Sequence, residues 1–376
     1  MALTRVKKIT NDSLSGSITA NKLDIGQIGG RKNMIINGAM QVAQRASTVT
    51  GIGASSGYFS ADRWRINVNG TSAGRLTMKH AAPNDLPGFQ RSIKLECTTA
   101  DTSIAAGERM FLETRLEGQD VQGMMKGTSD AKAVTVSFYV KGHDSATYTV
   151  GLYEATSGRK IAATFPVTTS WVRQTVTFPG DTTGVMANDN TVQLHLRFYL
   201  HSGSNYTSGT LGTSWNADGN TTQISSSGNS FFESTSAEFF LTGVQMEIGE
   251  HASPFEHRSY GEELSLCQRY YQVVPKYTFF NGAVEVSSNS LRAGVPITRP
   301  LRASPTIGNI TLIVYDDDDT SFSNAAHAVF ANSGSYEVDG STGFLSVVFN
   351  GNLSGRTDNH NVTALYGTDG TLDAEL

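Results

Sequence analysis

The sequence has few charged residues, few cysteines and no long apolar run. Charged residues make up 17% of the 376 positions and the net charge is −5, which argues against a protein that coats nucleic acid. The cysteines Cys97 and Cys267 are too few and too far apart for a disulfide framework or a zinc site. No apolar run reaches bilayer length, and the first ten residues lack the apolar core of a signal peptide. We therefore expect synthesis in the cytoplasm, no membrane insertion and two small buried thiols.

Familiar catalytic and cofactor motifs are also missing. The sequence has no P-loop and no GxGxxG, HExxH or CxxC spacing. Carboxylates that cleave glycosides lie roughly 5 to 10 Å apart, and nothing in the sequence fixes such a pair among Glu96, Glu113 and Glu154. His195 and His201 lie about 20 Å apart along one strand, too far to share a metal. We predict no enzymatic activity, no cofactor and no metal site.

The sequence is instead rich in short alternating segments separated by Gly, Ser, Asn and Asp. Residues 192–200 show the pattern most clearly, with Val192, Leu194, Leu196, Phe198 and Leu200 on the predicted inner face. Similar strands are predicted at residues 33–42, 92–99, 134–140, 148–152 and 172–178. Many half-buried strands at short spacing are typical of an all-β fold, and we predict one antiparallel jelly-roll β-sandwich over residues 33–258.

Residues 237–272 mark the end of this predicted sandwich. Phe240, Thr242, Val244, Met246 and Ile248 alternate on one predicted strand face. Pro254 should stop the sheet, and Ser259 with Glu262 forms a capping box that starts an amphipathic helix over residues 259–272. The predicted helix links the sandwich to a smaller C-terminal β domain, residues 273–376.

Two stretches of unusual charge need separate interpretation. Asp316 to Asp319 follow one another without the alternation that a calcium loop needs, so a solvated loop is favoured. Residues 1–32 are basic and show little apolar periodicity, which predicts either a disordered tail or an arm that orders against a partner.

Three motifs carry a resemblance to a known class of protein. They are NMIINGAMQVAQR at residues 33–45, GVQMEIG at 243–249 and SPFEHRSYGEELSLCQRYY at 253–271. These motifs resemble tail-fibre and receptor-binding virion proteins of tailed bacteriophages, especially phages of marine bacteria, and the likeness extends from about residue 33 to the C-terminus. It implies a structural virion protein and a homotrimer, and it brings no catalytic residues.

The resemblance also implies a role for the N-terminal arm, which would attach the fibre to phage tail or adaptor proteins. The expected anchoring contacts are basic or apolar side chains, namely Arg5, Lys7, Lys8, Leu14, Ile18, Leu23 and Ile25. The trimer is expected to place the 259–272 helix near its axis, because Leu266 and Tyr270 form a second apolar strip beside Leu264 and Cys267.

The candidate ligand site lies on the outward face of the 192–201 strand. If the even-numbered residues are buried, the odd-numbered side chains emerge together, and aromatic rings beside Arg, Gln and His suit a sugar. The predicted glycan-binding residues are Gln193, His195, Arg197 and Tyr199, with Tyr139, Tyr153 and Arg173 on neighbouring strands and Trp215 in the polar 202–230 loop. The other tryptophans, Trp64 and Trp171, are predicted to be core. An alternative is a solvated or subunit-facing strand surface without a ligand.

The function predicted from the sequence is that of a phage tail-fibre subunit that adsorbs to host cell-surface polysaccharide. Two alternatives stay open: a virion-associated polysaccharide depolymerase, and a purely structural appendage of the neck, head or tail.

Overall fold

The computed structural model describes most of the predicted sandwich and parts of the region C-terminal to it. Residues 31–70, 72–217, 219–275, 297–308 and 370–376 are described in full, and between residues 279 and 366 the backbone of six further strands is described. The seven predicted anchoring residues, from Arg5 to Ile25, lie outside the described residues, as do residues 317–319 of the aspartate run.

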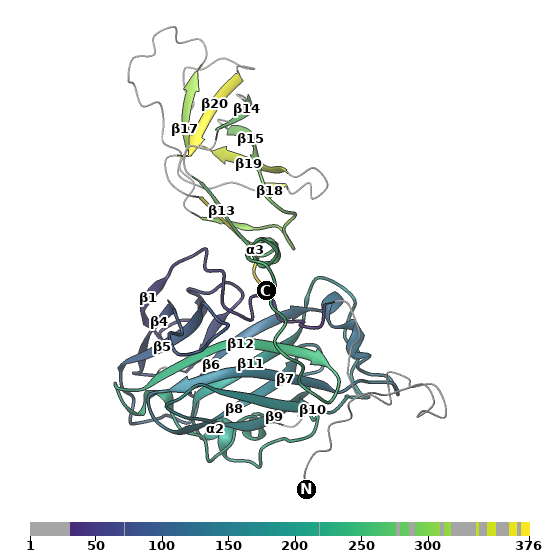
Figure 1. Ribbon diagram of the computed structural model, residues 1–376. Helices are drawn as coiled ribbons and strands as arrows, with labels where there is room; N and C mark the ends of the chain where they lie inside the picture. The colour runs from purple at the N-terminus through teal and green to yellow at the C-terminus, as the bar shows by residue number, and fades with distance from the viewer. Residues whose placement is uncertain are drawn as a thin grey trace, which may run out of the picture.

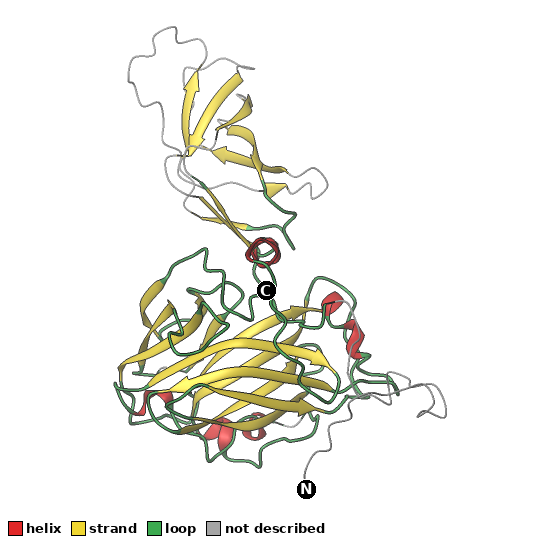
Figure 2. Ribbon diagram, in the orientation of Figure 1, coloured by secondary structure: helices red, strands yellow, loops and turns green. Residues whose placement is uncertain are grey.

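The larger part of the molecule is a sandwich of two antiparallel sheets with six strands each (Figures 1 and 2). Sheet A has the order β1 (Thr48–Ile52), β4 (Arg75–Ala81), β5 (Ser92–Thr99), β12 (Glu238–Ile248), β7 (Val134–Gly142) and β10 (Val172–Phe178). Sheet B has the order β2 (Gly57–Tyr58), β3 (Arg65–Asn69), β6 (Arg109–Glu117), β11 (Val192–Ser202), β8 (Ala146–Glu154) and β9 (Lys160–Val167).

The strand order identifies the sandwich as a jelly roll. From β5 to β12 the chain passes repeatedly between the sheets, so that β5-β12-β7-β10 faces β6-β11-β8-β9. The inner faces follow the alternation of the sequence, since Leu194, Leu196 and Phe198 are fully buried. Phe198 meets Phe138 of the opposite sheet edge to face, with ring centroids 4.9 Å apart. The predicted all-β jelly roll is thus confirmed.

Strand β12 departs from the predicted alternation at a glycine. Gly243 has a φ of +59°, and the pairing register with β7 shifts between Thr242 and Gln245. Such a bulge reverses which residues face inward, because an extra residue enters one strand. Phe239 is therefore fully buried and Phe240 lies on the outer face, although Phe240 and Thr242 were predicted to share a face with Val244. That part of the prediction is wrong.

The strand predicted at residues 33–42 is also absent. The segment makes a turn in which Asn37 and Met40 have φ near +57°, a conformation that asparagine tolerates better than most residues. The Asn37 side chain accepts a hydrogen bond from Val42 N and donates to Val42 O. The segment still joins sheet A, because Val244 N donates to Gly38 O.

The linking helix α3 (Tyr260–Cys267) begins where the capping box predicts. Ser259 Oγ accepts a hydrogen bond from Glu262 N at its first turn. The helix ends at Cys267, earlier than the predicted residue 272, because Tyr271 starts strand β13 (Tyr271–Val274) and pairs with Asp373. Cys267 and Cys97 are both free and buried, as predicted.

A smaller β region follows α3, as predicted (Figure 1). It contains the sheet β13-β21-β16 and the sheet β17-β20-β14-β15-β19-β18. Their bounds are β14 (Phe279–Glu285), β15 (Ser290–Pro296), β16 (Thr306–Gly308), β17 (Leu312–Asp316), β18 (Tyr336–Glu337), β19 (Phe344–Asn350), β20 (Asn361–Tyr366) and β21 (Gly370–Asp373). After β21 the chain returns to the jelly roll, where Arg63 forms an ion pair with Glu375.

Among the described residues, no helix is both long and apolar enough to span a membrane.

Candidate functional site

The predicted binding row on β11 faces outward from sheet B but is not exposed. Gln193, His195, Arg197 and Tyr199 retain only 4 to 8% of their surface. Of the other predicted members, only Tyr153 lies on a strand adjacent to β11. It belongs to β8 and lies directly opposite His195. The four side chains therefore share an outward face as predicted, but they are buried and do not form a free ligand surface.

A buried carboxylate organises this face of sheet B. Glu113 on β6 is fully buried, and its Oε2 accepts hydrogen bonds from His195 Nδ1 and Arg197 Nε, both at 3.0 Å. Its Oε1 accepts from Arg115 Nε at 2.9 Å and Arg65 Nη1 at 3.3 Å. From the sequence, Glu113 was only one of several possible catalytic carboxylates, because its partners come from strands far apart in the chain.

The charges around Glu113 set its protonation. Burial by itself raises the pKa of Glu113, but the hydrogen bond from His195 and the charges of Arg197 and Arg115 outweigh it, so the pKa is strongly lowered. Burial lowers the pKa of His195, against the opposing effect of Glu113. Glu113 is therefore an ionised carboxylate that holds positively charged neighbours in place.

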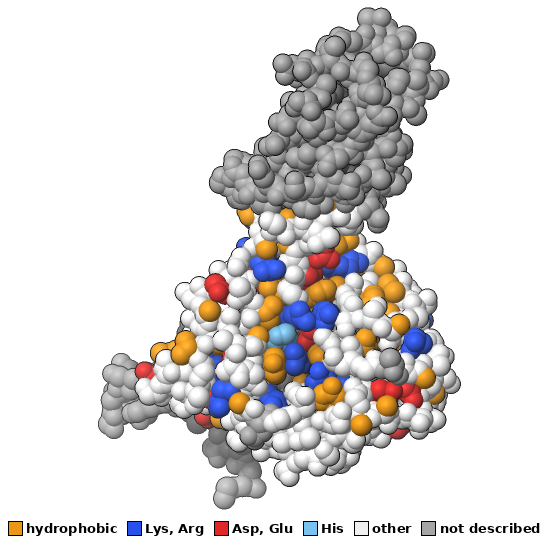
Figure 3. All heavy atoms as spheres, turned by 180° about the vertical axis from the view of Figure 1, so that it is seen from behind, with side chains coloured by type: hydrophobic (Ala, Val, Ile, Leu, Met, Phe, Trp, Pro, Cys, Tyr) orange, Lys and Arg blue, Asp and Glu red, His pale blue; other side chains and the backbone are white. Residues whose placement is uncertain are grey.

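Aromatic rings and two covering segments close the same face. The Arg197 guanidinium lies 4.1 Å from the Tyr153 ring centroid and 4.9 Å from that of Phe111. Tyr199 is buried in a small apolar cluster with Phe111 and Ile224 of the 203–230 segment. At the other end, Arg115 donates a hydrogen bond to the Leu376 carbonyl oxygen. On the side of the molecule opposite to that of Figure 1, Lys and Arg side chains gather around a histidine and acidic groups (Figure 3).

The remaining predicted members of the glycan site lie elsewhere. Tyr139 on β7 and Arg173 on β10 pair with each other in sheet A, so their assignment to strands beside β11 was wrong. Gln193 is held by Thr156 Oγ1 and Ala187 N. Trp215 is partly buried, packs against the main core and donates to Pro179 O at 2.7 Å, away from the β11 row. Strand neighbours in a jelly roll are distant in sequence, which is why sequence order misplaced Tyr139 and Arg173.

The outer face of sheet A offers a more accessible site, called here the sheet A groove. It is a cavity of about 570 Å³ lined by Lys79, Ala81, Ala82, Pro83, Asn84, Asp85, Lys94, Glu96, Lys141, Trp171 and Phe240. Four of these residues form one row across four adjacent strands, because Lys79 pairs with Lys94, Lys94 with Phe240, and Phe240 with Lys141. The row is therefore fixed by strand register.

Asp85 and Trp171 close one end of the sheet A groove. The Asp85 carboxylate accepts hydrogen bonds from Lys141 Nζ at 2.6 Å and Trp171 Nε1 at 2.8 Å. The Trp171 ring lies 6.0 Å from that of Phe240, at 68°. Trp171 is only partly buried, so its prediction as a core residue was wrong. Two aromatic rings beside hydrogen-bonding side chains are thus present on this face.

The carboxylates of the sheet A groove are paired with lysines. Glu96 accepts from Lys79 Nζ at 2.6 Å and Lys94 Nζ at 2.7 Å. Although partial burial raises the pKa of Glu96, its hydrogen bonds to Lys79 and Lys94 lower it overall. The hydrogen bond from Lys141 likewise lowers the pKa of Asp85. Both groups are therefore ionised near neutral pH.

The sequence contains little that would reveal this groove. Phe240 reaches the outer face only because Gly243 shifts the register of β12, and the alternation alone places it inside. Lys79, Lys94 and Lys141 are ordinary outward residues of three strands. Only the sheet order brings them into one row.

Comparisons with known proteins give similarity of fold only. No family model matches the chain, and no curated protein matches it. Among 37 similar solved chains, one titled "CBM4 structure and function" is 11% identical, with 56% of this chain and 97% of that chain covered and a TM-score of 0.29. A family 11 carbohydrate-binding module from Clostridium thermocellum, in complex with a beta-1,3-1,4-mixed-linked tetrasaccharide, is 11% identical, with 55% and 99% covered and a TM-score of 0.28.

A third solved structure, TmCBM61 in complex with beta-1,4-galactotriose, is 8% identical, with 58% of this chain and 99% of that chain covered and a TM-score of 0.28. The jelly-roll assignment itself rests on the strand order of the two sheets.

Proposed function

We propose that this protein is a tail-fibre subunit of a tailed phage and that its sheet A groove binds host cell-surface polysaccharide. The observation that carries the binding proposal is the cross-strand row Lys79, Lys94, Phe240 and Lys141, which ends at Trp171. Aromatic rings stack on the CH faces of sugars, while ammonium and carboxylate groups bind hydroxyls. The virion assignment rests on the sequence resemblance.

The shape of the row favours an extended ligand. Adjacent strands lie about 4.8 Å apart, so a row across four strands is about 14 Å long. That length suits several sugar units in a chain better than a single ring. Because every charged group in the row has an oppositely charged partner, the ligand needs no particular net charge.

The proposed activity is binding without cleavage. Glycoside hydrolysis needs one carboxyl group that stays protonated to donate its proton. In the sheet A groove both Asp85 and Glu96 are paired with lysines that lower their pKa. The depolymerase alternative would therefore need a different pair of carboxylates.

The proposed fibre is a homotrimer attached to phage tail or adaptor proteins by residues 1–32. Three copies of a weak site bind usefully through avidity. Tyr260 of α3 is 58% exposed and Leu266 lines a shallow cavity, so this helix offers apolar surface to a neighbouring copy. Tyr270, predicted to belong to the same apolar strip as Leu266, is instead buried within the chain. Light scattering of the purified chain tests the assembly, and a monomer at micromolar concentration would contradict it.

The groove is tested by measuring adsorption to host cells with the variants Trp171→Ala and Lys141→Ala. A stacking contact and a charged hydrogen bond are each worth about 1 to 3 kcal/mol, so each change should weaken adsorption roughly tenfold or more. Lys132→Ala is the matched control, because Lys132 is exposed and lies outside the groove. Unchanged adsorption by both groove variants would refute the site, and release of reducing ends from purified polysaccharide would refute binding without cleavage.

A further inference from the structure

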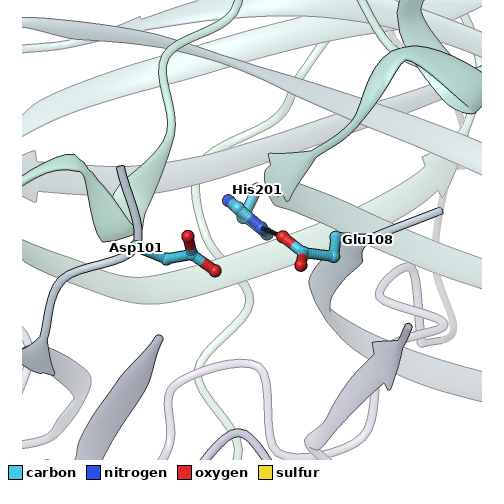
Figure 4. A group of neighbouring side chains, drawn as sticks. All are labelled: Asp101, Glu108 and His201. Atoms are coloured by element: carbon cyan, nitrogen blue, oxygen red, sulfur yellow. Dashed lines mark hydrogen bonds and ion pairs between the residues drawn. The ribbon is translucent and has the colours of Figure 1, made fainter. Parts of the chain in front are cut away.

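A histidine and two carboxylates converge at one end of the jelly roll, outside both surfaces described above (Figure 4). Asp101 lies in the connection from β5 to β6, Glu108 directly precedes β6, and His201 lies near the end of β11. One potential ligand atom from each lies within 4.8 Å of the others. The three residues keep only 5%, 4% and 1% of their surface exposed.

The two carboxylates differ in their partners. Asp101 is held by neighbouring donors, since Oδ2 accepts from Ser72 Oγ at 2.7 Å and Ala73 N at 2.9 Å, and Oδ1 accepts from Ser103 N at 3.1 Å. The Glu108 carboxylate has one hydrogen-bond partner in the part of the chain that the structure describes, namely His201 Nε2 at 3.3 Å from Oε2. No described lysine or arginine forms an ion pair with either carboxylate. Two carboxylates that are almost fully buried, with no basic side chain paired to them, favour a bound cation.

The imidazole of His201 is oriented as a metal ligand would be. Its Nδ1 lies 2.8 Å from Ser230 Oγ, which also accepts a hydrogen bond from Phe232 N at 3.1 Å. A ligating histidine usually donates its other ring N–H in this way, which fixes the tautomer and aims the free nitrogen at the metal. With Nδ1 turned to Ser230, the nitrogen of His201 that would bind the metal is Nε2, which lies 3.3 Å from Glu108 Oε2.

We propose that Asp101, Glu108 and His201 bind a divalent transition-metal cation of the zinc type. Tetrahedral zinc with bonds of about 2.0 to 2.2 Å places its ligand atoms about 3.3 to 3.6 Å apart, and Glu108 Oε2 already lies 3.3 Å from His201 Nε2. An imidazole ligand favours zinc over calcium or magnesium, which prefer oxygen ligands. The fourth ligand position is open to water.

The position of the cluster gives the cation a structural role. Asp101 follows a strand of sheet A, whereas Glu108 precedes a strand of sheet B and His201 lies within another. Ser230 belongs to the end of the 203–230 segment, and Phe232 behind it packs 5.2 Å from the His201 ring. One cation at this point would tie both sheets and the segment that covers Tyr199 into one unit.

The test uses the full chain, stripped of metal with EDTA and dialysed under reducing conditions. Bound metal is counted after incubation with ZnCl₂, and thermal unfolding is measured with and without it. We expect about one zinc ion per chain and a Tm increase of roughly 5 to 10 °C when free zinc is 100-fold above its Kd. Calcium and magnesium should give a smaller increase at the same concentration.

Two variants separate the site from other zinc ligands in the chain. His201→Ala and the isosteric Glu108→Gln should each lose the bound zinc and the Tm increase. His143→Ala is the control and should keep both, because the His143 side chain is half exposed and remote in sequence from the three ligands. If His201→Ala fails to fold, Glu108→Gln decides the outcome.

Three results would overturn the proposal. One is a wild-type chain that takes up no zinc and shows no Tm increase. Another is a Glu108→Gln variant that binds zinc as tightly as the wild type. The last is a Tm increase with calcium that zinc does not match, because this would mark an oxygen-ligand site.

Discussion

The outer faces of sheets A and B both carry cross-strand rows of charged and aromatic side chains, yet they differ in what covers them. On sheet B, the 203–230 segment packs over Tyr199 and the chain returns at Leu376 beside Arg115. On sheet A, the row from Lys79 to Lys141 lines a cavity of about 570 Å³. An outward strand face is therefore accessible to a ligand only where no other segment covers it.

Because the two faces are buried to different extents, their charged groups also contribute differently to stability. Glu113 is fully buried with arginines on both oxygens, whereas Glu96 keeps 23% of its side chain exposed beside two lysines. Removing one partner from a buried charge cluster leaves the others unpaired and desolvated. Exposed ion pairs are screened by water and contribute little. We therefore expect the sheet B cluster to stabilise the fold and the sheet A row to serve binding.

The largest expected effect is on the stability of a Glu113→Gln variant. It keeps the shape of the side chain but leaves Arg197, Arg115 and Arg65 without their shared negative charge. We expect the free energy of unfolding to fall by about 3 to 5 kcal/mol, measured by urea unfolding at pH 7. A loss below about 1 kcal/mol would show that the buried cluster is not structural.

The effect of Glu113→Gln should depend on pH. The folded pKa of Glu113 lies below its unfolded value of about 4.3. The stabilisation is then complete above that pH and is lost as the pH falls toward the folded pKa, since protonated Glu113 resembles glutamine. The stability difference between wild type and variant should therefore shrink between about pH 4 and pH 2. A difference that stays constant over this range would rule out the charge as its source.

The smallest expected effect is that of Glu96→Gln in the sheet A groove. Its ion pairs with Lys79 and Lys94 are partly exposed, so the free energy of unfolding should change by less than about 1 kcal/mol. Adsorption to host cells should still fall, because the two lysines lose the partner that positions them. A stability loss as large as that of Glu113→Gln would erase the distinction between the two faces.

Local patterns in the sequence were sufficient to predict the all-β jelly roll and the helix that follows it. Alternation with a period of two identified β7, β10 and β11, because apolar side chains point to the core from one face of each strand and more polar ones point away from it. Ser259 fixed the start of α3, since its side chain caps the first helical turn, although the Glu262 carboxylate binds Arg31 and does not complete the predicted capping box. The end of α3 was misplaced because Tyr271 joins a sheet with Asp373, a partner about a hundred residues away in the chain.

The sites were decided by the tertiary structure. The sequence alone predicted that His195 and Arg197 share an outward face, and the structure confirms that they do. Whether that face is open depends on where residues 203–230 and 370–376 fold back. The sheet A groove and the Asp101, Glu108 and His201 cluster depend on strand order and on irregularities in β12 and β11. Burial and pairing across sheets are properties of distant contacts, which a local periodicity does not encode.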